Sequence, residues 1–119
     1  MRPSSELGQY GENLAVEHLT AAGMTVLARN WRCREGELDI VARDGNALVF
    51  VEVKARSGTG FGEPAEALGP VKARRIRGLA CRWLMEQQPP GGHELRFDVV
   101  SVVCRRGAAP ELRHLRDAF

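Results

Sequence analysis

The sequence lacks the long apolar run and the paired cysteines that mark membrane and secreted proteins. No stretch approaches the ~20 apolar residues of a membrane-spanning helix, and the first residues carry acids where a signal peptide would be apolar. Cys33, Cys81 and Cys104 are odd in number, lie far apart and have no histidine at metal-ligand spacing. We therefore expect a cytoplasmic protein with neither a disulfide framework nor a zinc site.

A strong excess of either charge is also missing. The 17 Lys and Arg residues against 15 Asp and Glu give a net charge of +2, which excludes a histone-like polybasic protein. Nucleic-acid binding therefore depends on how the charge is distributed, and clustered arginines are what phosphate contact requires. The clusters are Arg29, Arg32 and Arg34, then Arg74, Arg75 and Arg77, then Arg105 and Arg106. For the cluster at 74–77, a solvated helix face is the alternative to phosphate contact.

The 119 residues are enough for one domain with a single core, so we expect one domain over 1–119. Apolar residues at helical spacing predict a helix that Ser4 or Ser5 could cap and that ends before Gly23, a residue suited to the C′ position. A second helix is expected from Pro64 or Ala65 to about Gln88, after a glycine-rich loop at 58–62. Short β-prone segments predict strands at 24–30, at 36–56 as a hairpin around Asp44-Gly45, at 95–103 and at 111–119.

This order of elements predicts an α/β fold, with a central mixed β-sheet of about five strands flanked by helices. The strand that ends in Glu52 is apolar on both faces up to that residue, which is typical of a central strand covered on both sides.

A group of charged residues follows this apolar run. Because side chains alternate along a strand, Glu52 and Lys54 share one face. If Asp44 and Gly45 form a two-residue turn, Asp39 lies opposite Phe50 and diagonal to Glu52 on that face, roughly 7 Å away between Cα atoms. A three-residue turn would place Asp39 on the other face.

Two carboxylates this close repel each other unless a cation lies between them, and hard oxygen ligands suit Mg²⁺ or Mn²⁺. Lys54 beside such a metal could orient water or stabilise charge that grows on a phosphate. The triplet alone is weak evidence, since charged residues on one strand face often form an ion-paired surface. Asp39 and Glu52 are therefore candidate metal ligands, and Lys54 a candidate catalytic residue.

The helices offer further candidates. Glu12 lies at the edge of the face of the first helix that should pack on the sheet, so it is a candidate catalytic residue that could reach the metal directly or through water, although an exposed glutamate is the plain alternative. Lys72 occupies an apolar stripe with Leu68, Ile76, Leu79 and Trp83, so it either extends outward to solvent or points at the site. We expect Lys72, Arg56 and Arg75 to contact nucleic acid. No chemistry is assigned to His18, His93 or His114, and Asp98 is left between a buried structural acid and a site residue.

Several motifs, in this order, resemble the YraN-like family of bacterial proteins over nearly the whole chain: Gly11-Glu12, Arg29-Asn30-Trp31-Arg32, GELDIVA, VFVEVKAR, Lys72, RFDVV and DAF. That family is assigned to the restriction-endonuclease-like PD-(D/E)xK superfamily and is similar to archaeal Holliday-junction resolvases. The resemblance implies a restriction-endonuclease-like three-layer fold and a nuclease. It also implies that Asp39, Glu52 and the Val53 carbonyl are metal ligands, Lys54 the catalytic lysine and Glu12 the helix-borne acid. Leu38 stands where the signature has proline.

Three functions fit these observations. The first is a Mg²⁺- or Mn²⁺-dependent nuclease that acts on DNA, with branched or damaged DNA as candidate substrates. The second is a nucleic-acid-binding module that keeps the nuclease fold without cleavage, and the third is a protein-interaction domain with an ion-paired surface. The sequence leaves open DNA against RNA, and whether a homodimer is needed to hold two strands.

Overall fold

The computed structural model describes residues 6–57, 68–91 and 94–119, which form two helices and five strands. Their order confirms the predicted succession α, β, β, β, α, β, β. The elements are α1 (Glu6–Ala21), β1 (Thr25–Cys33), β2 (Gly36–Asp44), β3 (Ala47–Ser57), α2 (Pro70–Gln87), β4 (Glu94–Cys104) and β5 (Glu111–Leu115).

The strands form one mixed sheet in the order β1-β2-β3-β4-β5, as expected. Strands β3 and β4 run parallel, and α2 lies between them in the chain, whereas the other neighbours are antiparallel. A parallel pair needs such a crossover because the chain must return to the same end of the sheet. The strand that carries Glu52 is the central one.

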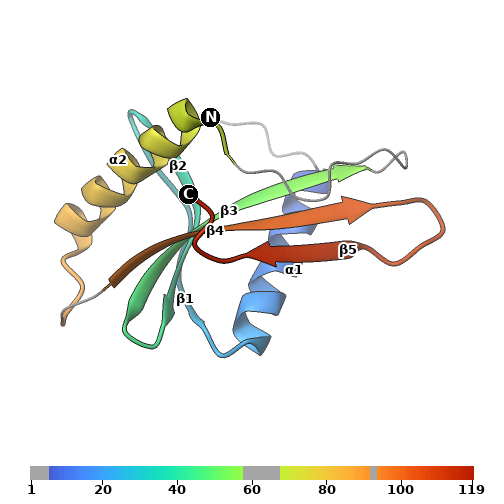
Figure 1. Ribbon diagram of the computed structural model, residues 1–119, viewed down its shortest axis with the longest axis horizontal. Coiled ribbons are helices and arrows are strands. Elements are labelled where there is room, and N and C mark those ends of the chain that lie inside the picture. Colours follow the sequence, from blue (N-terminus) through green and yellow to red (C-terminus); the bar gives the residue numbers. More distant parts are fainter. Residues whose placement is uncertain (1–5, 58–67, 92–93) are drawn as a thin grey trace.

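The two helices cover opposite faces of the sheet, so the fold has the expected three layers (Figure 1). On one face Ile76, Leu79 and Trp83 of α2 pack with Phe50 and Phe97 of the sheet. The other face forms a separate buried cluster with α1, through Ala15, Leu19, Ile40, Ala42, Val49, Val51, Val100 and Val102. Alternate apolar residues of β3 therefore belong to the two separate cores, as expected for a central strand that is covered on both faces.

Helix α1 ends as its glycine predicts. Gly23 has φ +94°, and its N–H bonds the carbonyl of Thr20 while the N–H of Met24 bonds that of Leu19, both at 3.0 Å. This is a Schellman motif, and buried Met24 and Leu19 supply its apolar contact. The predicted cap at Ser4 or Ser5 lies outside the described residues.

The register of the β2–β3 hairpin differs from the predicted one. Asp44 pairs with Ala47, so the two-residue turn is Gly45-Asn46 rather than Asp44-Gly45. Gly45 has φ +59°, as at the first central position of a type II′ turn, where glycine is favoured. The prediction chose a type I′ turn at Asp-Gly, and the neighbouring Gly-Asn pair forms the turn instead. Val41, rather than Asp39, therefore lies opposite Phe50, and the ladder between the two strands ends at Ile40–Val51, before it reaches Asp39 and Glu52.

Two other boundaries also differ from the prediction. Helix α2 begins at Pro70, with Gly69 as its N-cap, because proline suits the first helical position. Leu68 is therefore buried beside α2 rather than within it, and the loop at 58–62 lies outside the described residues. The last strand stops at Leu115, and the chain then turns back so that the N–H of Ala118 bonds the carbonyl of Phe97 at 2.7 Å. Neither described helix is both long and apolar enough to cross a bilayer.

Candidate functional site

The regular pattern of β2 is interrupted at Asp39. Leu38 and Val41 belong to the same buried cluster although they are three positions apart, so simple alternation fails between them. On the β1 side, the pairs on either side place Asn30 opposite Asp39, and Asn30 has φ +52°. A non-glycine residue in this region is uncommon and marks a local irregularity of the strand. The candidate site is therefore built where the sheet departs from regular pairing.

The Asp39 carboxylate reaches across to β3. Its Oδ2 accepts a hydrogen bond of 2.9 Å from the N–H of Val53, and the side chain is almost fully buried. Because the ladder of paired residues between the two strands stops at Ile40–Val51, the Asp39 side chain satisfies an amide just beyond its end. Asp39 thus lies against the middle of the Glu52-Val53-Lys54 segment.

Glu52 faces the α2 side of the sheet, on the same face as Phe50. Its Oε2 forms an ion pair of 2.8 Å with the ammonium of Lys72, and only 12% of the Glu52 side chain is exposed. Of the two orientations considered for Lys72, the structure has the one directed at the site. Lys54, two residues further along β3, belongs to the same face by alternation and is partly exposed.

Glu12 is buried on the α1 side of the sheet. Its Oε1 accepts hydrogen bonds from Arg29 Nε and Nη2 at 3.2 and 2.8 Å, and from Asn30 Nδ2 at 2.9 Å. The plain alternative of an exposed helical glutamate is therefore wrong, since Glu12 is 5% exposed. Its contact with Asn30, which stands opposite Asp39, joins α1 to the irregular part of the sheet.

Helix α1 can bring Glu12 this close because the preceding residue is glycine. A Cβ on Gly11 would lie 2.5 Å from the Cβ of Ala55, a separation that two carbon atoms cannot adopt without movement of the backbone. The Gly11-Glu12 motif therefore combines a close approach to β3 with an acid at the sheet.

The donor atoms fit a Mg²⁺ or Mn²⁺ ion held by few protein ligands. Asp39, Glu52 and the Val53 carbonyl offer oxygen donors, and Mg²⁺ is commonly held by one or two carboxylates with water in the other positions. Within residues 6–57, 68–91 and 94–119, no three acidic, histidine or cysteine side chains converge as in an all-protein cage. Glu52 already carries a cation, the Lys72 ammonium, so a metal at this oxygen would have to displace it.

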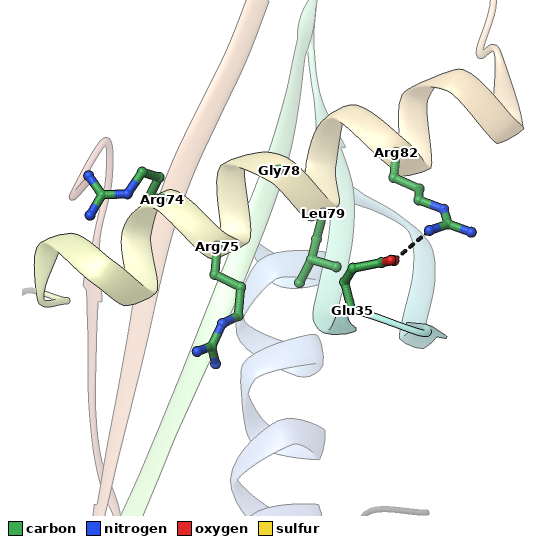
Figure 2. Close-up of a pocket in the computed structure, with 6 residues that line it drawn as sticks. All are labelled: Glu35, Arg74, Arg75, Gly78, Leu79 and Arg82. Carbon is green, nitrogen blue, oxygen red and sulfur yellow. Dashed lines mark hydrogen bonds and ion pairs between the residues drawn. The ribbon is translucent and has the colours of Figure 1, made fainter.

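The predicted nucleic-acid contacts lie on two elements. Arg56 follows Lys54 on β3, where it is partly buried and pairs in register with Val103. Arg75 is exposed on α2, one turn beyond Lys72, and lines a cleft between α2 and the β1–β2 turn (Figure 2). The structure thus brings Asp39, Glu52 and Lys72 to one region and places Arg75 next to it along the helix.

Comparison with known proteins identifies the family to which this chain belongs. A model described as "Uncharacterised protein family UPF0102" matches residues 11–102. The chain belongs to the UPF0102 family. This confirms the resemblance to YraN-like proteins.

Relatives within this family match along nearly their whole length. The UPF0102 protein of Acidothermus cellulolyticus is 52% identical over 95% of this chain and 92% of its own length. Those of Nocardia farcinica and Streptomyces griseus are each 54% identical, over 95% and 98% of this chain and 88% and 98% of their own lengths. The similarity to these relatives therefore extends over nearly the whole chain.

This UPF0102 chain also contains a polar network that sequence reasoning missed. His18 Nε2 lies 3.0 Å from His114 Nδ1, and His114 Nε2 lies 2.8 Å from Oδ2 of Asp98, whose side chain is fully buried. Arg96 donates to both Asp98 oxygens at 3.0 Å, and the N–H of Asp117 donates to Oδ1 at 2.9 Å. Asp98 is therefore the buried structural acid of the two alternatives. In the sequence, only the acid within a valine-rich strand pointed to this network. The two histidines gave no such signal, because they are 96 positions apart in the chain.

The network changes the ionisation of two of its members. Burial alone would raise the pKa of Asp98, but hydrogen bonds from His114 and Arg96 bring it below its usual value. Burial lowers the pKa of His18, and the nearby His114 and Arg116 lower it further. Asp98 is therefore held as a carboxylate, and His18 favours its neutral form.

Proposed function

We propose that this protein is a Mg²⁺- or Mn²⁺-dependent nuclease that hydrolyses phosphodiester bonds in DNA, with branched or damaged DNA as the expected substrates. The observation that carries the proposal is the bond from Val53 N–H to Asp39 Oδ2, which holds one acid against the strand segment that contains the second acid and the lysine. The resemblance of Asp39 and Glu52-Val53-Lys54 to the PD-(D/E)xK signature supports the same assignment. Fold alone would not, since one fold hosts many functions.

Each residue has a role that its position supports. Asp39, Glu52 and the Val53 carbonyl would hold the metal, which would supply positive charge for the phosphate and activate water. Lys54 orients the attacking water and stabilises the charge that develops on the phosphate oxygens. Glu12 is a positioning residue, since its oxygen is engaged by Arg29 and Asn30 and it acts on Asp39 through the strand.

Lys72, Arg56 and Arg75 provide phosphate contacts outside the reacting group. A metal at Glu52 would replace the Lys72 ammonium as its cation partner, and Lys72 would then be available to the DNA backbone. Backbone contacts of this kind position a substrate without reading its sequence, and they weaken as salt is added.

The test is cleavage of linear and four-way-junction DNA in Mg²⁺ or Mn²⁺. Glu52→Gln and Lys54→Met should each reduce the rate by about 10²-fold or more, the typical loss on removing one group that stabilises a transition state. Glu111→Gln, an exposed glutamate on β5, is the matched control and should cleave like the wild type. Cleavage that survives both site variants would identify a contaminating nuclease and refute the assignment.

The Glu52–Lys72 ion pair favours a second candidate, a nucleic-acid-binding module without cleavage, because an internal ammonium takes the place of a metal at Glu52. Lys72→Met separates the two. In a nuclease, removing the competing ammonium should tighten Mn²⁺ binding, measured by calorimetry, while it weakens DNA binding. In a binding module, DNA affinity is unchanged by Mn²⁺, and no cleavage accompanies it.

We further propose that the protein acts in the cytoplasm. On substrates in which two DNA strands must be bound at once, we propose that it acts as a homodimer. Sedimentation of the protein with junction DNA tests the dimer, since a monomer on every substrate would contradict it.

A further inference from the structure

A second feature lies beside the candidate site, in the cleft between α2 and the β1–β2 turn. Its lining comprises Glu35, Arg74, Arg75, Gly78, Leu79 and Arg82, and we call it the α2 cleft (Figure 2). The exposed surface of this lining is mainly carbon, although half of its residues are arginines. The floor is therefore apolar and the rim polar.

The charges of the rim are unequally compensated. Arg82 forms ion pairs with Glu35 and with Glu86, the latter at 3.2 Å. Arg74 and Arg75 form no ion pair with any carboxylate of the described residues. The α2 cleft therefore has one end where two carboxylates compensate Arg82, and another end where Arg75 has no carboxylate partner among the described residues, while Arg74 extends to the other side of the helix (Figure 2).

Gly78 leaves space on the helix side of the cleft. A Cβ added there would meet no atom within 4 Å, so packing does not require a glycine. Gly78 lies inside a regular helix, where glycine is less favourable than any residue except proline. Neither backbone conformation nor packing accounts for this residue, whereas a ligand that lies against the helix would use the space.

We propose that the α2 cleft binds one unpaired nucleotide of the substrate, with its base against Gly78 and Leu79 and its phosphate on Arg75. This rests on the proposed function and specifies its substrate class as DNA with unpaired nucleotides. A base has apolar faces and polar edges, which match the carbon floor and the Arg82–Glu35 pair. Unpaired bases commonly stack on side chains and on guanidinium planes in this manner.

The position of the cleft agrees with this role. Arg75 is three residues beyond Lys72, so the two side chains are neighbours on one helix surface. Lys72 contacts Glu52 of the candidate metal site. A strand that crosses Glu52 and Lys72 would therefore reach Arg75 and the cleft within one or two helical turns. A bare phosphate would leave the apolar floor unused, and an apolar peptide would leave Arg75 without a partner.

The experiment fills the cleft and measures DNA binding in EDTA, where no cleavage occurs. Gly78→Leu places a large side chain in the open space, and Cys81→Leu adds the same residue at an exposed position one turn along α2, outside the lining. Fluorescence anisotropy compares a short single-stranded oligonucleotide with a duplex of the same sequence. Gly78→Leu should weaken single-strand binding by about fivefold or more, the range of one lost stacking contact, and duplex binding by less than about twofold. Cys81→Leu should bind both like the wild type.

Two results would overturn the inference: single-strand affinity unchanged in Gly78→Leu, or an equal loss on duplex and single strand, which indicates general phosphate contact. A measurement on the wild type covers the case in which Gly78→Leu does not fold. Adenosine monophosphate should shift the NMR methyl signals of Leu79 and not those of Leu112 on β5, and no shift at Leu79 would reject the cleft. If the protein cleaves DNA but the cleft binds no nucleotide, the nuclease proposal stands and the present inference fails. If the cleft binds a nucleotide but no DNA is cleaved, only the present inference is supported.

Discussion

Replacing Gly11 by alanine tests how closely α1 packs on the sheet. The new Cβ would lie 2.5 Å from the Cβ of Ala55, 3.7 Å from its Cα and 3.8 Å from the Cβ of Val102. Carbon atoms normally pack about 3.5–4.0 Å apart, so the first contact overlaps by roughly 1 Å. Ala55 has no rotamer through which its methyl group could move away, because its Cβ is fixed by the strand backbone. The helix and the strand must therefore separate.

The magnitude follows from two opposed effects. Overpacking a core by one methyl group typically costs about 1–3 kcal/mol. Alanine in place of glycine inside a helix returns about 0.5–1 kcal/mol. We expect a net loss of about 1–2 kcal/mol in the free energy of unfolding, which for a domain of this size lowers Tm by roughly 4–8 °C.

Thermal and urea unfolding followed by circular dichroism measure the loss, and a double-mutant cycle identifies its cause. Ala55→Gly removes the opposing methyl group, so the Gly11→Ala/Ala55→Gly protein should be more stable than the sum of the two single changes predicts, by about 0.5–3 kcal/mol. A Gly11→Ala protein with an unchanged or higher Tm would refute the reasoning, because it would show only the helix propensity of alanine.

Three further predictions concern stability. The lowered pKa of His18 means that the unfolded chain binds a proton first as the pH falls through 6.5, so stability should decline below that pH and the decline should flatten in His18→Gln; parallel pH profiles would contradict this. Asp98→Asn replaces the fully buried carboxylate that accepts bonds from Arg96, His114 and the Asp117 amide, and it should cost about 1.5–3 kcal/mol in urea unfolding, the range for hydrogen bonds to a charged group. Asp44→Asn, at a partly exposed ion pair of the same Arg96, should cost less than about 1 kcal/mol. Equal losses would show that burial does not decide the cost. Gly78→Ala should raise the free energy of unfolding by about 0.5–1 kcal/mol, since its methyl group meets open space, and a lower Tm would indicate an unseen contact.

Patterns within one element predicted the local structure well. The apolar repeat and Gly23 located the end of α1, and the doubly apolar run before Glu52 identified the central strand. Boundaries set by competing local signals were less accurate. Asp44-Gly45 and Gly45-Asn46 are both acceptable turns, and the pairing along the whole hairpin selects between them. The start of α2 was placed too early because Pro64 and Pro70 both suit a first helical turn.

Contacts between distant segments could not be predicted in the same way. Lys72 had two orientations open to it, and only the packing of α2 on β3 brings its ammonium to Glu52. His18 and His114 are isolated in the sequence. They become partners because α1 packs on the face of the sheet to which His114 of β5 points. The α2 cleft likewise depends on where the β1–β2 turn lies against the helix.

The sequence by itself therefore determined the order of elements, the mixed sheet, the family and the identity of Asp39, Glu52 and Lys54 as the candidate residues, because apolar periodicity and short motifs are local properties of the chain. Only the tertiary structure decided that Asp39 accepts a hydrogen bond from the Val53 amide and that Lys72 forms an ion pair with Glu52. It also decided that Glu12 accepts hydrogen bonds from Arg29 and Asn30. These contacts depend on register and on the approach of the helices to the sheet. Both are set by packing across the whole chain, as the close contact of Gly11 with Ala55 illustrates.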